Sequence, residues 1–341
     1  MTELPKIVHL LDDLSLGGVT RSLELFQHPA LKRHYDFTTE EVQPDWSIAP
    51  KIDAAVIVVH FSVSWKTLPF LYSLAARNPR SSLVLMEHSY SREWEGLYVS
   101  EQARFRSMLK LAHKIFDRVI CVSNAQALWL QEVADLREPK REVIYPWSDM
   151  QGLAQLSRPH FSLKEPITIG AYGRFVGDKG LERLIDAMNL LGDKNEVKLL
   201  IGGFGPDEDK LKRMAGSNPD ISFYGPVERV DDFLGQCDVV AVPSKFESYG
   251  LVATEARLAA RPIFVSGVGG LSEQVGDAGL IIDFDDQVSV VKWMEGLRHM
   301  PLISMSVAAR EACLRVTEQR VEAWLEILTD LILSPASLKA A

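Results

Sequence analysis

Short runs of apolar residues recur along the chain, and helical spacing of apolar positions follows most of them. Such runs are typical of strands that are buried on both faces of a parallel sheet. In the first half they span residues 7–11, 54–59, 82–86 and 118–122. In the second half they span residues 167–172, 197–201, 221–224, 239–242, 262–265 and 279–282. The helical stretches between them include residues 180–191, 206–215 and 249–260.

This alternation predicts an α/β protein with two Rossmann-like, doubly wound parallel sheets joined by right-handed crossovers. The pattern lapses over residues 151–165, which are rich in Ser, Pro and polar residues, so we interpret them as the linker. We expect one domain over residues 1–155, a second over 156–316, and a helix within 317–341 that packs back toward the first domain. Two such domains would face a cleft between the carboxyl ends of their strands, where open α/β folds bind ligands.

Composition excludes several classes of protein. The net charge of -9 argues against general nucleic-acid binding, which needs a basic surface. No apolar stretch is long enough for a transmembrane helix, and the N-terminus lacks a basic signal-peptide start, so we expect a cytoplasmic protein. The three cysteines lie far apart without metal-ligand spacing, which indicates reduced core residues and no metal site.

Two basic stretches interleave aromatic residues with Lys and Arg, over residues 65–80 and 103–118. Each could rest on anionic lipid, which would place the protein peripherally at the inner face of a membrane. The alternative is a helix that faces the core and has a solvated basic side, and we prefer it.

The segment PSKFESYGLVATEARLAARP predicts an anion site at a helix start. A strand ends before it, and a Ser- and Gly-containing turn opens a helix whose first amides lack intrahelical partners, which favours phosphate. Glu247 precedes this helix and Glu255 lies two turns on, so the pair could hold hydroxyl groups on either side of a diphosphate, as in a nucleotide sugar. A helix from residue 248 would separate them by roughly 12 Å along its axis. Alternatively, Glu247 caps the helix and Glu255 pairs with Arg257 or Arg261 in solvent.

The segment GAYGRFVGDKGLERLIDAM follows the first strand of the second half. Gly173 and other glycines allow a tight turn, and Arg174 and Lys179 place two cations on a loop that leads into a helix. Two fixed cations suit a diphosphate whose charge grows as a glycosidic bond breaks. The alternative is a solvated basic loop.

Two further candidates lie in the first half. Gly17 and Gly18 follow the first strand, where backbone amides could approach a ligand closely, although a tight turn alone explains them equally well. His88 follows another strand among polar and aromatic residues and could donate to a sugar hydroxyl. For His9 and His60 we favour ordinary packing. The glycines of LLIGGFGPDEDK do not form GxGxxG, which counts against an NAD oxidoreductase.

Taken in order, GGVTR, EHS, GRFVGDKG, FYGPV and the ESYGLVATE element resemble family 4 retaining glycosyltransferases of the GT-B fold. The resemblance implies an N-terminal acceptor domain and a C-terminal nucleotide-sugar donor domain. It assigns the leaving diphosphate to Arg174 and Lys179, the ribose hydroxyls to Glu255 and the transferred sugar to Glu247.

The resemblance implies further contacts. Amides of Tyr249, Gly250 and Leu251 would contact phosphate and sugar, those of Gly17 and Gly18 the diphosphate, and the main chain of Val227 the base; His88 would lie near the sugar and the acceptor.

The implied function is transfer of a hexose-type sugar, with retention and without a metal or other cofactor, to a glycan or lipid-linked acceptor in cell-surface polysaccharide or glycolipid synthesis. The alternatives are another GT-B enzyme, such as a sugar-nucleotide epimerase or a phosphorylase, and a non-catalytic nucleotide-sugar-binding protein.

Overall fold

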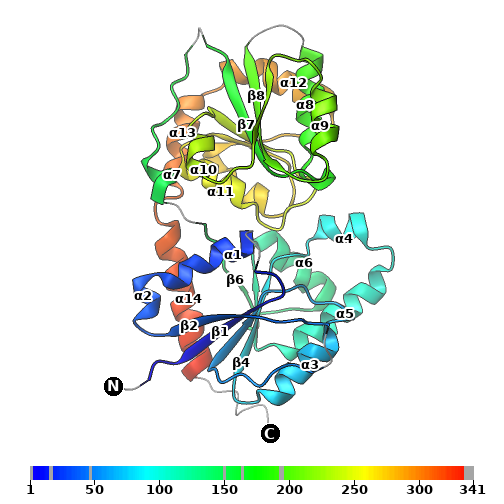
Figure 1. Ribbon diagram of the computed structural model, residues 1–341, viewed down its shortest axis with the longest axis vertical. Coiled ribbons are helices and arrows are strands. Elements are labelled where there is room, and N and C mark those ends of the chain that lie inside the picture. Colours follow the sequence, from blue (N-terminus) through cyan, green and yellow to red (C-terminus); the bar gives the residue numbers. More distant parts are fainter. Residues whose placement is uncertain are drawn as a thin grey trace. The chain divides into compact units, whose positions relative to one another are not determined.

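In the computed structural model the chain forms two compact units, described here over residues 3–14, 18–45, 48–148, 151–162, 165–191 and 196–333 (Figure 1). The first unit comprises Met1–Asp149 and Val316–Ala341, and the second comprises Met150–Arg315. Residues 151–155, which the sequence analysis assigned to a linker, instead form helix α7 (Gln151–Gln155) of the second unit. Helix α7 packs against α10 and α11, which explains why a polar segment is ordered there.

The first unit is built on a six-stranded sheet of order β2-β1-β3-β4-β5-β6, in which all neighbouring strands are parallel. Its strands are β1 (Lys6–Leu11), β2 (Asp36–Glu41), β3 (Val56–Val59), β4 (Ser82–Glu87), β5 (Arg118–Cys121) and β6 (Arg141–Val143). Its helices are α1 (Gly18–Ser22), η1 (Leu23–Gln27), α2 (Pro29–Lys32), α3 (Leu68–Arg77), α4 (Arg92–Tyr98), α5 (Gln102–Ile115), α6 (Asn124–Ala134) and α14 (Val316–Leu333).

The second unit has a six-stranded parallel sheet of order β12-β11-β10-β7-β8-β9. Its strands are β7 (Ile167–Arg174), β8 (Val197–Phe204), β9 (Ile221–Gly225), β10 (Val239–Val242), β11 (Ile263–Val265) and β12 (Gly279–Ile281). Besides α7, its helices are η2 (Gly177–Lys179), α8 (Leu181–Leu191), α9 (Glu208–Ala215), α10 (Val230–Leu234), α11 (Leu251–Leu258), η3 (Gly269–Gln274), η4 (Gly276–Ala278), α12 (Gln287–Gly296), η5 (Leu297–His299) and α13 (Leu302–Glu311).

The predicted α/β fold with two doubly wound parallel sheets is confirmed. Each sheet has its own hydrophobic core, because the central strands bury both faces between helices. Two strands of the first sheet, β2 and β6, were not predicted from the sequence. Both are edge strands with the polar sequences DFTTEE and REV, so neither shows the apolar run of a central strand.

Helix α14 belongs to the first unit although it follows the second in sequence. Its buried side chains include Trp324, whose ring lies 5.0 Å from that of Phe26 in an edge-on arrangement. Tyr35 and Thr329 share a hydrogen bond of 2.8 Å between their hydroxyl groups, which also ties the helix to this unit. Residues from the two ends of the chain therefore complete one core.

Helix α5 has the features of a core-facing helix with a solvated basic side. It buries Met108, Leu109, Ala112, His113 and Ile115, and it exposes Arg104, Lys110 and Lys114. The Arg104 guanidinium lies 5.8 Å from the Trp65 ring, so cation and aromatic ring interact at the surface.

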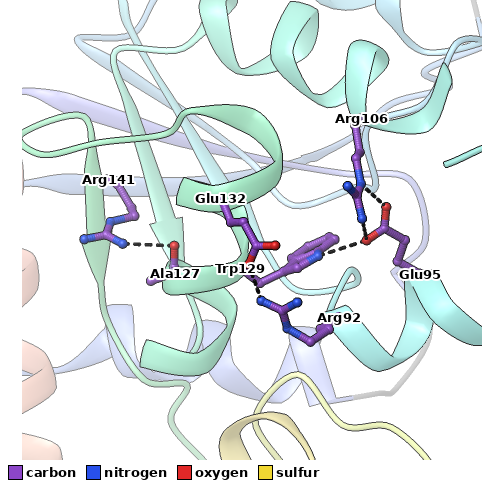
Figure 2. A network of polar contacts seen from close by, with 7 residues as sticks. All are labelled: Arg92, Glu95, Arg106, Ala127, Trp129, Glu132 and Arg141. Carbon is purple, nitrogen blue, oxygen red and sulfur yellow. Dashed lines mark hydrogen bonds and ion pairs between the residues drawn. The ribbon is translucent and has the colours of Figure 1, made fainter. Parts of the chain in front are cut away.

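A buried carboxylate joins three helices of the first unit (Figure 2). Glu95 on α4 is 2% exposed and accepts two hydrogen bonds from Arg106 on α5, of 2.6 and 3.1 Å. The Trp129 indole N–H on α6 donates to the same carboxylate at 3.1 Å. Full pairing of this kind offsets the cost of burying a charge.

Replacing Glu95 with alanine is expected to lower the free energy of unfolding of the first unit by about 1–3 kcal/mol, because the buried Trp129 N–H loses its acceptor. Glu132→Ala is the control, since that glutamate forms an exposed ion pair with Arg92 in the same region and such pairs contribute about 0–1 kcal/mol. Urea unfolding, monitored by tryptophan fluorescence, measures the free energy of unfolding of both variants. Equal midpoints for the two variants would contradict a structural role for Glu95.

Candidate functional site

The candidate site of the second unit lies where β7 and β10 end. These strands are neighbours in the sheet, but the chain runs from β7 outward to β8 and β9 and then returns to β10 on the other side. The loops that leave β7 and β10 therefore diverge, and this is the switch point at which open α/β sheets bind ligands. The loop after β7 contains Lys179, and the loop after β10 contains Glu247.

The two loops lie in close contact. Gly180 has φ +65°, and a Cβ atom there would lie only 2.1 Å from the Pro243 carbonyl oxygen. Arg183 donates to this same oxygen at 3.0 Å, and the Lys245 amide donates to the Asp178 carbonyl at 2.8 Å. Only glycine allows the two backbones to approach so closely, so Gly180 positions Lys179 beside the second loop.

Lys179 and Glu247 form an ion pair. The Lys179 Nζ lies 2.6 Å from Glu247 Oε2, and the Ser244 hydroxyl donates to the same oxygen at 3.3 Å. The side chains of Lys179 and Glu247 are 34% and 20% exposed, so the pair remains accessible to a ligand. Sequence reasoning assigned these residues to separate groups of a donor but did not foresee that they contact each other.

Glu255 lies in the second turn of α11 and is 4% exposed. Its Oε2 accepts a hydrogen bond of 2.6 Å from the Tyr172 hydroxyl, on the adjacent strand β7. The alternative in which Glu255 pairs with an arginine in solvent is therefore wrong. Helix α11 begins at Leu251 rather than near residue 248, because Gly250 adopts φ +90° as its N-cap. Glu247 thus precedes the helix, and the expected axial separation of the two glutamates does not apply.

The turn before α11 is fixed by hydrogen bonds from Gln274, which lies far from it in sequence. The Gln274 amide donates to the carbonyl oxygens of Tyr249 and Gly250, at 2.8 and 3.1 Å. Thr254 Oγ1 lies 2.6 Å from Gln274 Oε1 and 2.9 Å from the Tyr249 hydroxyl. These buried contacts fix the turn that leads into Leu251, so the first amides of α11 have a defined direction.

Three other predicted residues lie at the same edge of the sheet. Gly173 and Arg174 are the last residues of β7, and Arg174 is exposed. Val227 follows β9 and is half-buried; its Cγ2 would lie 2.6 Å from a Cβ atom placed on Gly202 of β8. The ends of β7, β8 and β9 therefore bring the predicted cation and base contacts to one rim, together with the Lys179–Glu247 pair.

Three of the predicted residues, Gly17, Gly18 and His88, belong to the first unit. Gly17 lies outside the described residues, and Gly18 is the exposed first residue of α1. His88 is half-buried and comes directly after β4. The preceding Glu87 is buried, and one of its oxygens accepts hydrogen bonds from the amides of Ser89 and Tyr90 at 3.0 and 3.2 Å. Burial raises the pKa of Glu87 to about 7.

Sequence reasoning assigned His9 and His60 to packing, but both are hydrogen-bonded to other histidines. His9 Nδ1 lies 2.9 Å from His60 Nε2, and His60 Nδ1 lies 3.0 Å from His88 Nε2. Burial lowers the pKa of all three side chains, that of His9 to about 3 and that of His88 to about 4. The three imidazoles are therefore neutral near pH 7. The local sequence around any one histidine does not predict these two hydrogen bonds, because the three residues come from three different strands.

Among the side chains of the described residues there is no group of three or more His, Cys, Asp or Glu that could hold a metal ion. None of the helices in the described part of the chain combines the length and apolar character needed to cross a bilayer.

Residues 155–306, almost the whole second unit, match the family described as glycosyl transferases group 1. An uncharacterised glycosyltransferase of Methanocaldococcus jannaschii is 31% identical over 192 residues, which are 52% of this chain and 49% of that protein. A D-inositol 3-phosphate glycosyltransferase of Mycolicibacterium smegmatis is 31% identical over 188 residues, which are 50% of this chain and 42% of that protein. The chain thus matches about half the length of these curated relatives.

Among solved structures, the Anabaena protein HepE in complex with UDP and glucose is similar to this chain, with a TM-score of 0.74 and 18% identity. The likeness covers 96% of this chain and 100% of the Anabaena chain. At this level of identity it shows the fold alone, which is the GT-B type of two-domain α/β fold that the sequence motifs imply.

Proposed function

Because residues 155–306 match the family described as glycosyl transferases group 1, we propose that the protein transfers a sugar from a nucleotide-diphosphate donor to an acceptor. In the proposed reaction the sugar is of the hexose type, its anomeric configuration is retained and no metal is required. The proposed acceptor is a glycan or lipid-linked molecule of cell-surface polysaccharide or glycolipid synthesis, modified at the cytoplasmic side.

The observation that supports this proposal best is the placement of two carboxylates and a lysine around the start of one helix. Glu247 and Lys179 lie in contact just before α11, and Glu255 is buried within it beside Tyr172. A diphosphate at this helix start would meet the amides of the first helical turn, the positive end of the helix dipole and the Lys179 ammonium. The glycines at the end of β8, in the sequence GGFG, do not form the GxGxxG pattern of a dinucleotide site.

In the proposed mechanism, Lys179 turns from Glu247 to the diphosphate, with Arg174 as the second cation. The bond between the anomeric carbon and the phosphate oxygen breaks, and the acceptor oxygen forms its bond to the same carbon on the same face. The acceptor proton passes to the leaving phosphate, so the products are a glycoside and a nucleoside diphosphate. Cations fixed beside the leaving group stabilise the charge that develops there.

The carboxylates bind the two sugars of the donor in this proposal. Glu247, released from Lys179, accepts hydrogen bonds from hydroxyls of the transferred sugar, and Glu255 accepts them from the ribose. The Tyr172 hydroxyl already orients one Glu255 oxygen at 2.6 Å. Amides of Tyr249, Gly250 and Leu251 contact the phosphate and sugar, and the Val227 main chain contacts the base.

A screen against UDP-, GDP-, ADP- and TDP-sugars tests the donor class. A ligand that binds only the native state at 100 times its Kd stabilises it by about 2.7 kcal/mol, so the matching donor raises the melting temperature. With that donor, proton NMR of the slow hydrolysis product reports which anomer forms first, and EDTA is expected to leave the rate unchanged. If no nucleotide sugar shifts the melting temperature and none is consumed, the proposal is wrong.

The same NMR experiment separates the two alternatives. An epimerase converts the donor into an isomeric nucleotide sugar without releasing nucleoside diphosphate. A non-catalytic nucleotide-sugar-binding protein raises its melting temperature with a donor but leaves the donor spectrum unchanged in the presence of candidate acceptors.

A further inference from the structure

The three linked histidines of the first unit span three adjacent strands. His9 lies within β1, His60 comes directly after β3 and His88 comes directly after β4, and the sheet order places β3 between β1 and β4. The hydrogen bonds of 2.9 and 3.0 Å therefore run across the sheet toward its carboxyl edge. Only His60 contacts both of the other rings through its two nitrogens.

His9, at one end of the three linked histidines, is buried away from solvent. His9 is 1% exposed, and its Nε2 has no hydrogen-bond partner among the described residues. Its ring instead packs against Phe26 and Phe37, with centroids 4.3 and 6.0 Å away. A proton that entered at His88 could not leave at His9, so the three linked histidines do not conduct protons.

Three neutral imidazoles that are linked in this way have only two possible hydrogen-bonding arrangements. A neutral imidazole has one N–H and one lone pair, so each bond fixes the direction of the next. If every ring holds its proton on Nε2, His9 buries an N–H without an acceptor. If every ring holds its proton on Nδ1, His9 buries only a lone pair, and unpaired acceptors are tolerated better than unpaired donors. The second arrangement leaves His88 with Nδ1–H as a donor.

The buried residue Glu87 directly precedes His88. Its Oε1 accepts hydrogen bonds from the amides of Ser89 and Tyr90, which fixes the turn that contains His88, and its Oε2 has no hydrogen-bond partner among the described residues. The backbone of His88 is thus fixed by this turn, and its ring is hydrogen-bonded to His60.

We propose that His60 is a positioning residue that, backed by His9, holds His88 as a neutral imidazole with Nδ1–H available as a fixed donor at the carboxyl edge of the first sheet. That the acceptor of this hydrogen bond is a sugar hydroxyl rests on the proposed transferase function; the state of the three rings does not.

Nitrogen-15 NMR of histidine-labelled, ligand-free protein tests the state of the rings directly. We expect the chemical shifts of His9, His60 and His88 to report neutral rings protonated on Nδ1, without titration between pH 5.5 and 8. Each His→Gln variant assigns one signal by its loss. Titration of His60 or His88 near pH 6.5, or protonation on Nε2, would overturn the proposal. Because no donor is needed, this result is independent of whether the protein transfers sugar.

Two isosteric replacements of His60 separate positioning from packing. The asparagine amide nitrogen can occupy the place of Nδ1, which faces His88, whereas the glutamine amide reaches the place of Nε2, which faces His9. In donor hydrolysis or transfer, we expect His60→Gln to lower kcat/KM about tenfold, as for loss of one oriented hydrogen bond, and His60→Asn to stay within about threefold of the natural protein.

A double-mutant cycle with His88→Ala completes the test. If His60 acts through His88, adding His60→Gln to His88→Ala causes no further loss, since contacting residues that act together are not additive. Multiplied losses, or equal losses in the Asn and Gln variants, would show a merely structural role. Should His60→Gln not fold, His9→Phe serves instead, with the tautomer of His88 read by NMR.

Discussion

Turnover falls by a factor of about 100 or more when Lys179 is replaced by alanine, if this residue faces the leaving diphosphate. The transition state loses a cation beside its developing charge. The ion pair of 2.6 Å with Glu247 does not contribute to this loss, because Glu247 is released from Lys179 when the donor binds. The measurement is the rate of nucleoside diphosphate release at saturating donor, so that weaker binding is not mistaken for slower chemistry.

Lys245→Ala is a matched control for this prediction. The Lys245 side chain is also 34% exposed and forms an ion pair with Glu182 at 3.0 Å, so its removal deletes the same charge and the same kind of contact. We expect its turnover to remain within about threefold of the natural protein, as for loss of a half-exposed ion pair. Near-normal turnover of Lys179→Ala, or equal losses in both variants, would refute the assignment of Lys179.

Glu255→Ala is expected to weaken donor binding by a factor of about 10 to 100, as for loss of hydrogen bonds to a charged group. The side chain is almost fully buried, and the hydroxyl of Tyr172 already holds one of its oxygens. Isothermal titration calorimetry with the donor that the thermal screen selects gives the affinity. Tyr172→Phe removes the orienting hydroxyl and keeps the carboxylate, so a smaller loss is expected.

Loss of a buried glutamate could also weaken binding by destabilising the protein. Glu95→Ala controls for this effect, because Glu95 is a similarly buried glutamate of the other unit. Its carboxylate accepts hydrogen bonds from Arg106 and Trp129 (Figure 2). We expect it to lower stability while leaving donor affinity unchanged. Unaltered affinity of Glu255→Ala for every nucleotide sugar tried would remove Glu255 from the ribose site.

Most of the strands that were predicted from sequence have side chains that face a core on both sides. All six strands of the second sheet and the four inner strands of the first show apolar runs such as VIVV of β3 and VVAV of β10. The edge strands β2 and β6 of the first sheet have no such run, because their sequences DFTTEE and REV are polar. The edge strands β9 and β12 of the second sheet were predicted although they are partly exposed, because ISFYG and GLI keep apolar residues. The hydrophobic pattern therefore predicts an edge strand only where its sequence is apolar.

The sequence suggested individual residues for the candidate site but not the contacts between them. Lys179 and Glu247 were identified from their loops, yet their pairing joins positions 68 residues apart. Tyr172 and Gln274, which orient Glu255 and the turn before α11, have no local signal that distinguishes them from core residues. The chain order of β7 and β10 gives no clue to their adjacency until the sheet order is known. Residue chemistry is local, whereas orientation depends on topology.

Helix α14 has a consequence for biosynthesis. The first 149 residues leave the ribosome without the segment that buries Trp324 against Phe26 and joins Thr329 to Tyr35, whereas residues 150–315 emerge as one uninterrupted unit. Residues 150–315 can thus reach their native state first, and the earlier-made unit waits, with an apolar flank uncovered, until α14 has been synthesised. A premature stop codon within the codons of α14 would therefore damage the unit whose strands were translated first.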